Sequence, residues 1–243
     1  TDKCNLRCTY CMPAEGLEWL SKQAVMSAEE IVRIVRIGVD MLGVRELRLT
    51  GGEPLVRRGM PELIKRLGGY LGNGLEELTL TTNGTLLEQF ADLLVENGVK
   101  RINVSLDSLD PAGFEAITRR GKFRKVMEGL EAAKKARLKI KVNTVALKGV
   151  NDDEVHQLVE WCGREGFDLT FIEVMPMGDM GGEDRLDQYW PLTQVKAKLA
   201  ERWTMHEKSW RAAKAQWKGS FSGVVPKVMH SKPKARCDVV CNF

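Results

Sequence analysis

The chain has 243 residues, of which 43% are hydrophobic and 29% are charged. This length and composition suit one large soluble α/β domain with at most a short appendage. The formal net charge of +4 is too small to indicate a nucleic-acid-binding protein, and no apolar run approaches the roughly 18–20 residues of a membrane span, so we expect neither nucleic acid nor a membrane as a partner.

Hydrophobic periodicity predicts helices and strands that alternate along the chain. Ser27 and Glu30 form a capping-box sequence at the start of a helix that extends to Leu42. The next segment, "ELRLT" (46–50), alternates apolar and polar residues and is short enough for a strand. Further strands are predicted at 77–82, 100–106, 139–147 and 168–175, and further helices at 60–71, 86–98, 123–137, 152–165 and 191–203.

Strand and helix units in this order form parallel sheets, either open or closed into a barrel. No Gly-rich dinucleotide fingerprint follows a first strand, whereas polar or Gly-rich segments follow the C-terminal end of each strand. Barrel enzymes build their active sites at those strand ends. With a further strand before Thr1, six units predict an incomplete (β/α)6 TIM-type barrel over residues 1–180, followed by a short irregular C-terminal extension over residues 181–243.

Three cysteines, Cys4, Cys8 and Cys11, lie close together in a C-x3-C-x2-C pattern with no fourth cysteine nearby. Structural zinc takes four protein ligands, so a zinc site would need one more. A redox pair of Cys8 and Cys11 would leave Cys4 without a role. In a [4Fe–4S] cluster, three thiolates leave one iron open to another ligand. Of these three kinds of site, the pattern favours the cluster.

The cysteine pattern, with Tyr10 just before its third member and "TGGEP" (50–54) after a strand, resembles the radical S-adenosylmethionine (SAM) superfamily. The resemblance implies a [4Fe–4S] cluster whose open iron is chelated by SAM, which is then cleaved to a 5′-deoxyadenosyl radical. It implies these roles: Cys4, Cys8 and Cys11 as cluster ligands, and Tyr10, Gly52 and Glu53 as SAM-binding residues.

The later motifs "LTTNG", "INVSLDSLD", "IKVNTV" and "FIEVMPMG" occur in an order that resembles the GTP 3′,8-cyclases of molybdenum-cofactor biosynthesis. The resemblance implies that the radical removes hydrogen from ribose C3′ of GTP. The C3′ radical then attacks guanine C8, and a second reduction of the resulting radical yields (8S)-3′,8-cyclo-7,8-dihydroguanosine 5′-triphosphate. It adds Ser105 and Met175 as SAM contacts and assigns Arg48, Thr81 and Lys141 to GTP.

The C-terminal region departs from this family. Cyclases carry a second [4Fe–4S] cluster on C-x2-C and a third, later cysteine, whereas "RCDVVCNF" offers only Cys237 and Cys241, spaced C-x3-C. The arginines that normally follow the pair are absent, and Thr170 stands where the family usually has an arginine. Residues 181–243 are therefore interpreted as a diverged remnant of the second-cluster and substrate-binding region, with Cys237 and Cys241 as its candidate ligands.

Two other functions remain open at this point: a radical SAM enzyme with a different substrate, and a catalytically silent cluster- or nucleotide-binding homologue. A radical SAM enzyme needs an electron donor protein, and the resemblance also allows a homodimer. We expect a cytoplasmic location, with the mitochondrial matrix as the alternative because the chain opens on Thr1 rather than on Met. Cys162, beside Trp161 on a predicted helix, is interpreted as a packed thiol.

Overall fold

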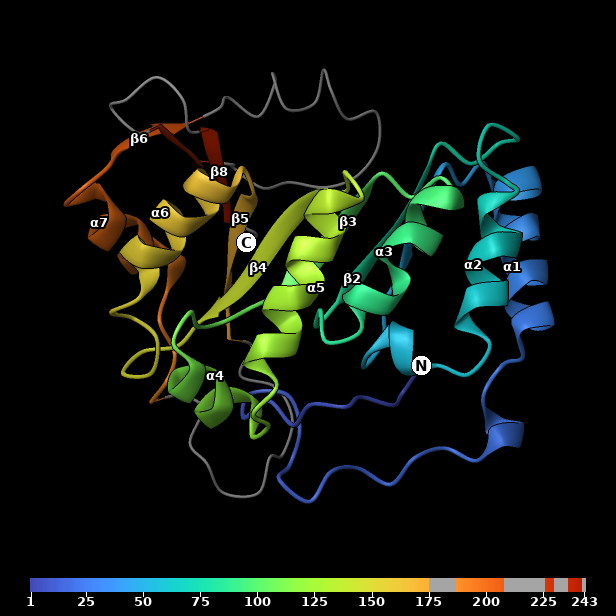
Figure 1. Ribbon diagram of the computed structural model, residues 1–243, viewed down its shortest axis with the longest axis horizontal. Helices are drawn as coiled ribbons and strands as arrows, with labels where there is room; N and C mark the ends of the chain where they lie inside the picture. The colour runs from blue at the N-terminus through green and yellow to red at the C-terminus, as the bar shows by residue number, and fades with distance from the viewer. Residues whose placement is uncertain (175–186, 208–225, 230–235, 242–243) are drawn as a thin grey trace. The chain divides into compact units, whose positions relative to one another are not determined.

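The computed structural model describes residues 1–174, 187–207, 226–229 and 236–241 (Figure 1). The strands are β1 (Glu46–Leu49), β2 (Glu77–Thr82), β3 (Arg101–Ser105), β4 (Lys139–Ala146), β5 (Asp168–Glu173), β6 (Thr204–Glu207), β7 (Pro226–Met229) and β8 (Arg236–Cys241). The α-helices are α1 (Ala28–Leu42), α2 (Met60–Gly68), α3 (Leu87–Glu96), α4 (Pro111–Thr118), α5 (Phe123–Lys135), α6 (Val155–Glu165) and α7 (Leu192–Ala200). Two 3-10 helices cover Lys22–Ala24 (η1) and Pro54–Val56 (η2).

The chain folds as two compact units, and the first contains residues 1–7, 14–105 and 122–140. Its strands β1, β2 and β3 pair in parallel and in sequence order. The helices α1 and α2 pack against each other, as do α3 and α5 (Figure 1). The core of this unit is formed by apolar side chains that alternate along the strands, including Leu78, Leu80, Ile102 and Val104, each at most 1% exposed.

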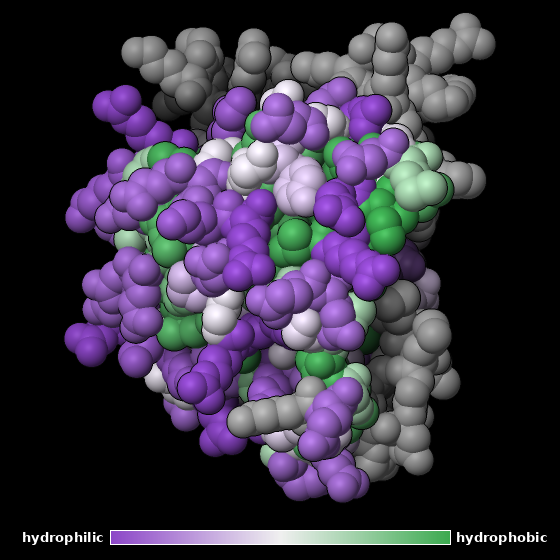
Figure 2. Space-filling model, turned by 90° about the vertical axis from the view of Figure 1, so that its right-hand side faces the viewer, coloured by the Kyte–Doolittle hydropathy of each residue, from purple (hydrophilic) through white to green (hydrophobic). Residues whose placement is uncertain are grey.

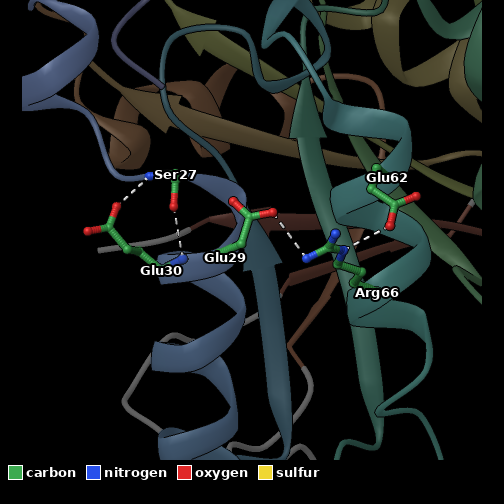
Figure 3. A network of polar contacts seen from close by, with 5 residues as sticks. All are labelled: Ser27, Glu29, Glu30, Glu62 and Arg66. Carbon is green, nitrogen blue, oxygen red and sulfur yellow. Dashed lines mark hydrogen bonds and ion pairs between the residues drawn. The ribbon is translucent and has the colours of Figure 1, made fainter.

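The start of α1 shows how local sequence fixes the helices of the first unit (Figure 3). The Ser27 hydroxyl accepts a hydrogen bond from the Glu30 backbone N–H, and the Glu30 carboxylate accepts one from the Ser27 backbone N–H. This confirms the predicted capping box, which satisfies two backbone donors that a helix start leaves unpaired. Arg66 of α2 pairs with Glu29 of α1 and with Glu62 on its own helix, at 3.2 and 2.8 Å. Exposed pairs of this kind add little stability, and only the one with Glu29 joins the two helices.

The outer face of α1 is partly apolar. Figure 2 shows the side of the molecule that carries α1 and α2, where hydrophilic side chains predominate and hydrophobic ones appear between them. On α1 the exposed hydrophobic side chains are Ile34, Ile37, Met41 and Leu42. None of the described helices is long and apolar enough to cross a membrane.

The second unit contains residues 8–13, 106–121 and 141–243. Strand β4 begins in the first unit and continues here from Lys141, pairing in parallel with β5, which in turn pairs in parallel with β8. Strands β8, β7 and β6 are joined by antiparallel pairing. Cys162 is 0% exposed in α6, so it is the packed thiol that its sequence context predicts.

The predicted alternation of helices and parallel strands is confirmed from α1 to β5. Helix α4 was missed, although Asp110 caps its first turn by accepting from Gly113 N–H at 2.7 Å and Pro111 opens it. Its eight residues are too few to show a helical period. Strand β8, which pairs with β5 and β7, was also missed. The predicted boundary at residue 180 falls within residues 175–186, outside the described part of the chain.

Candidate functional site

The cysteine pattern lies in an irregular segment at the start of the chain. Cys4 belongs to the first unit, whereas Cys8 and Cys11 belong to the second. Cys4 and Cys8 are partly exposed, and Cys11 is exposed. The Cys11 and Met12 backbone N–H groups both donate to the Cys8 carbonyl, at 2.9 and 3.0 Å, so a tight turn separates the second and third cysteines.

Two N–H groups of the first unit point at the sulfur of Cys4. The Leu6 backbone N–H lies 3.5 Å from Cys4 Sγ, and the Asn83 side-chain Nδ2 lies 3.9 Å from it. The Arg7 guanidinium donates to the Cys4 carbonyl at 3.0 Å, which places a cation beside the same residue. N–H donors at a cysteine sulfur are common around the thiolate ligands of iron–sulfur clusters. The surroundings of Cys4 therefore suit a sulfur that acts as a metal ligand.

The segment with Cys8 and Cys11 is attached to the second unit at three points. The Thr9 backbone N–H donates to the Ile117 carbonyl at 2.9 Å, and the Arg119 guanidinium donates to the Met12 carbonyl at 3.0 Å. Between them, the Tyr10 hydroxyl donates to Asp107 Oδ2 at 2.7 Å. The Tyr10 side chain packs on a buried apolar cluster formed by Ile117, Leu147 and Val174.

Asp107 is a buried carboxyl, only 4% exposed, at the C-terminal side of β3. Its Oδ1 accepts from the Val145 backbone N–H at 2.8 Å, and its own carbonyl accepts from the Asn151 side chain at 2.7 Å. Burial raises the pKa of Asp107 from 3.8 to about 6, against the opposing effect of its hydrogen bonds to Val145 and Tyr10. Burial and the Asp107 charge hold the pKa of Tyr10 well above its ordinary value of 10, so the phenol keeps its proton and donates.

The Gly51–Gly52 pair follows β1 and lies against the chain start. The backbone N–H of Gly52 donates to the Thr1 carbonyl, and that of Glu53 to the Lys3 carbonyl, both at 2.8 Å. A Cβ on Gly51 would lie 2.2 Å from the Thr1 carbonyl oxygen, and one on Gly52 would lie 2.4 Å from that of Lys3. Only glycine permits this approach of two backbones.

The Glu53 carboxylate is fully buried and has three donors from its own protein. Its Oε1 accepts from Leu55 N–H at 3.0 Å and from the Thr82 hydroxyl at 2.8 Å, while its Oε2 accepts from Asn83 N–H at 2.6 Å. Burial raises the pKa of Glu53, and these hydrogen bonds oppose that rise. Glu53 thus fixes the turn after β2 to the Gly51–Gly52 segment. Its predicted contact with SAM stays a prediction.

One face of each unit's sheet carries several polar side chains. In the first unit Arg48 is in register with Thr79 and Thr81 with Asn103, and because side chains alternate along a strand, Arg48, Thr81, Asn103 and Ser105 share a face. In the second unit Lys141 and Asn143 share a face with Thr170, the register partner of Asn143. Asn103 Oδ1 and Thr170 Oγ1 are buried and have no hydrogen-bond partner. Buried polar atoms of this kind suit a ligand that is absent from the protein alone.

The other predicted site residues have these positions. Arg48 is exposed, and Thr81, Ser105 and Lys141 are partly buried. Met175 lies outside the described residues. Cys237 and Cys241 lie on β8, where the structure describes only the backbone, with Cys241 in register with Phe171 of β5. Within the described ranges, no three side chains of His, Cys, Asp or Glu are grouped to hold a single metal ion.

Sequence reasoning missed several polar residues of this region, namely Asn5, Asn83, Thr85, Asn103, Asp107 and Asn151. Asn83 and Asp107 were inside the quoted motifs "LTTNG" and "INVSLDSLD", so their position after a strand was a usable signal. Asn5 and Asn151 gave no such signal, because their roles depend on partners 78 and 44 residues away.

Comparison with known proteins gives three findings. The family model of the radical SAM superfamily matches residues 1–162. The GTP 3′,8-cyclases of Paracoccus denitrificans and Erythrobacter litoralis are 55% and 51% identical over 84% and 87% of this chain. The chain spans 59% and 63% of the length of these two relatives.

Among solved structures, Streptococcus suis SuiB bound to S-adenosylmethionine matches with a TM-score of 0.64. The match covers 83% of this chain and 44% of that one, at 20% sequence identity. An identity this low speaks for the fold alone. Together with the parallel strand–helix units, it confirms the predicted fold class, an incomplete (β/α)6 TIM-type barrel.

Proposed function

The chain belongs to the radical SAM superfamily. Within it, we propose that the chain is the catalytic part of a GTP 3′,8-cyclase. The proposed reaction converts GTP to (8S)-3′,8-cyclo-7,8-dihydroguanosine 5′-triphosphate, the first step of molybdenum-cofactor biosynthesis. The observation that carries the proposal is the identity of 51–55% with curated cyclases over 84–87% of this chain. A [4Fe–4S] cluster and SAM are the cofactors of the superfamily.

The residues present fit the cluster. Cys4, Cys8 and Cys11 are each at least partly exposed, and Cys4 has N–H donors at its sulfur. Thiolate ligands with such donors are the usual setting of iron–sulfur clusters. When bound, the cluster supplies the electron that cleaves SAM to methionine and a 5′-deoxyadenosyl radical.

The proposed SAM-binding residues are held by the protein before any ligand arrives. Tyr10 is fixed at its hydroxyl by Asp107 and at its ring by apolar packing. The Gly51–Gly52 segment is fixed by backbone hydrogen bonds to Thr1 and Lys3 and by the Glu53 carboxylate. Pre-formed positions of this kind reduce the entropy lost on binding and orient the bound group.

Arg48, Thr81 and Lys141 are the proposed GTP-binding residues. Arg48 and Thr81 share the polar face of the first unit, and Lys141 lies on the polar face of β4 in the second. A guanidinium can contact a phosphate with two parallel hydrogen bonds, while an ammonium acts as a point charge. Two such cations suit the triphosphate of GTP.

A second [4Fe–4S] cluster on Cys237 and Cys241 is part of the proposal. Cys237 is the second residue of β8 and Cys241 is its last, so both cysteines of the C-x3-C pattern lie on one strand. Iron analysis of a Cys237→Ala/Cys241→Ala variant tests this part separately. A loss of about four irons relative to the parent chain is expected if the second cluster forms.

The experiment that tests the function is anaerobic reconstitution followed by incubation with dithionite, SAM and GTP, with mass detection of the products. Cyclised GTP together with 5′-deoxyadenosine is the expected result. Formation of 5′-deoxyadenosine without cyclised GTP would favour a radical SAM enzyme with another substrate. Absence of both from protein with a complete cluster would favour a silent homologue. Replacing GTP by ATP provides the matched control, because it changes only the base.

The electron donor, the location and the oligomeric state are also proposed. A protein that delivers single electrons would replace dithionite, and the chain would act in the cytoplasm as a monomer or homodimer. Fractionation of the source cells and sedimentation of the purified chain test the location and the oligomeric state.

A further inference from the structure

Asn5, Asn83 and Thr85 form a closed ring of side-chain hydrogen bonds beside Cys4. Asn83 Nδ2 donates to Asn5 Oδ1 at 2.8 Å, and Asn5 Nδ2 donates to the Thr85 hydroxyl at 2.9 Å. The Thr85 hydroxyl donates to Asn83 Oδ1 at 2.7 Å and so closes the ring. Each member therefore donates once and accepts once, an arrangement in which the bonds strengthen one another.

The backbone fixes the direction of this ring. The Thr85 backbone N–H, which can only donate, lies 3.1 Å from Asn83 Oδ1. The amide oxygen of Asn83 must therefore face Thr85, and its NH2 group must face the other way. The Asn83 backbone is held as well, since its N–H donates to the buried Glu53 carboxylate at 2.6 Å.

The NH2 group of Asn83 has two hydrogens, and the ring uses one of them. The nitrogen lies 3.9 Å from Cys4 Sγ, within reach of a long N–H···S contact, so the second hydrogen is available to the sulfur. Because the orientation of the amide is determined by Thr85, a donor rather than an acceptor is presented to Cys4. The Leu6 backbone N–H, 3.5 Å from the same sulfur, is a second donor.

We propose that Asn83 is a positioning residue that donates a hydrogen bond to the Cys4 thiolate and thereby raises the reduction potential of the bound [4Fe–4S] cluster. Reduction adds negative charge that is shared with the cysteine sulfurs, and an N–H donor stabilises the charged form. Neither Asn83 nor its ring partners are assigned to SAM or GTP. The inference rests on Cys4 being a cluster ligand, as proposed above, and is independent of the identity of the substrate.

The test is the midpoint potential of the cluster in the anaerobically reconstituted chain, measured by a redox titration of the EPR signal that changes when SAM is added. Asn83→Ala removes the donor, so the potential should become more negative. We expect the ratio of reduced to oxidised cluster at a given potential to fall about tenfold, which is about 59 mV for one electron. Thr85→Val, which breaks the ring but leaves the Thr85 N–H, should shift the potential in the same direction by less.

Two control variants separate this effect from a general loss of structure. Thr85→Ser keeps the hydroxyl and should keep the parent potential. Asn73→Ala removes an exposed asparagine of the same unit whose amide donates to the Gly69 carbonyl, and it should also leave the potential unchanged.

An unchanged potential in Asn83→Ala with full iron content would overturn the proposal, as would an equal shift in Asn73→Ala. If Asn83→Ala does not retain iron, Thr85→Val decides, and an unchanged potential there overturns it. A Cys4→Ala variant with full iron content would instead refute the ligand assignment on which the inference rests.

Discussion

Replacement of Asp107 by Asn tests how the protein holds the segment between Cys8 and Cys11. Asp107 accepts from the Tyr10 hydroxyl and from the Val145 backbone N–H, and its side chain is almost completely buried. An Asn side chain has nearly the same shape. Its oxygen can accept from Val145 N–H, and its NH2 group can donate to the Tyr10 oxygen. The substitution therefore removes a buried charge while the contacts are kept.

The magnitude follows from the pKa of Asp107. Burial raises it from 3.8 to about 6, and each pKa unit corresponds to 1.36 kcal/mol, so ionisation of Asp107 costs the folded state about 3 kcal/mol relative to the unfolded state. Between these two pKa values the folded state holds a proton that the unfolded state has lost. The contribution of Asp107 to stability is therefore fully present below pH 4 and is lost as the pH rises through about 6.

The assay is urea unfolding of the parent chain and the Asp107→Asn variant, prepared identically, at a series of pH values from about 3 to 8. The free energy of unfolding of the variant relative to the parent should rise by about 3 kcal/mol across this range. Tyr10→Phe, which removes a hydrogen bond that lowers the pKa of Asp107, should move the change to higher pH. A difference between parent and Asp107→Asn that does not depend on pH would refute the reasoning.

Two further substitutions test the segment after β1. Gly52→Ala places a Cβ 2.4 Å from the Lys3 carbonyl oxygen, so the chain start must shift. We expect the free energy of unfolding in urea to fall by about 1–3 kcal/mol and SAM binding, measured by calorimetry, to weaken. Unchanged values would contradict the close approach. Glu53→Gln puts an NH2 group against a backbone N–H whichever way the amide is turned, because Leu55 N–H faces one oxygen and Asn83 N–H the other. A loss of about 1–3 kcal/mol is expected, and a variant as stable as the parent would show that the carboxylate is not required there.

The sequence predicted the fold well where periodicity is strong and the element is long. Helices α3, α5 and α6 bury one face each, which leaves a clear 3.6-residue pattern. The strands β1 to β5 alternate apolar and polar side chains over four to eight residues. Helix α4 has only eight residues, and β6 and β8 are stabilised by pairing with other strands rather than by a pattern of their own. Local sequence carries little of that information.

The site was predictable in its residue types but not in its internal connections. The three cysteines and the Gly51–Gly52 pair are recognisable from spacing alone. The hydrogen bonds to that segment are not, because Asn83 donates to Cys4 and Asp107 accepts from Tyr10 across 79 and 97 positions of the chain. The sequence predicted that the Glu53 carboxylate binds a ligand. In the structure this carboxylate accepts three hydrogen bonds from within the protein.

We propose that Cys4, Cys8 and Cys11 hold a [4Fe–4S] cluster that cleaves SAM. The most direct test of this proposal is iron content and 5′-deoxyadenosine formation, measured on the reconstituted parent chain and on a variant with all three cysteines replaced by alanine. The variant should bind about four fewer irons per chain and form no 5′-deoxyadenosine with dithionite and SAM. Unchanged iron content in the variant, or 5′-deoxyadenosine formed at the parent rate, would contradict it.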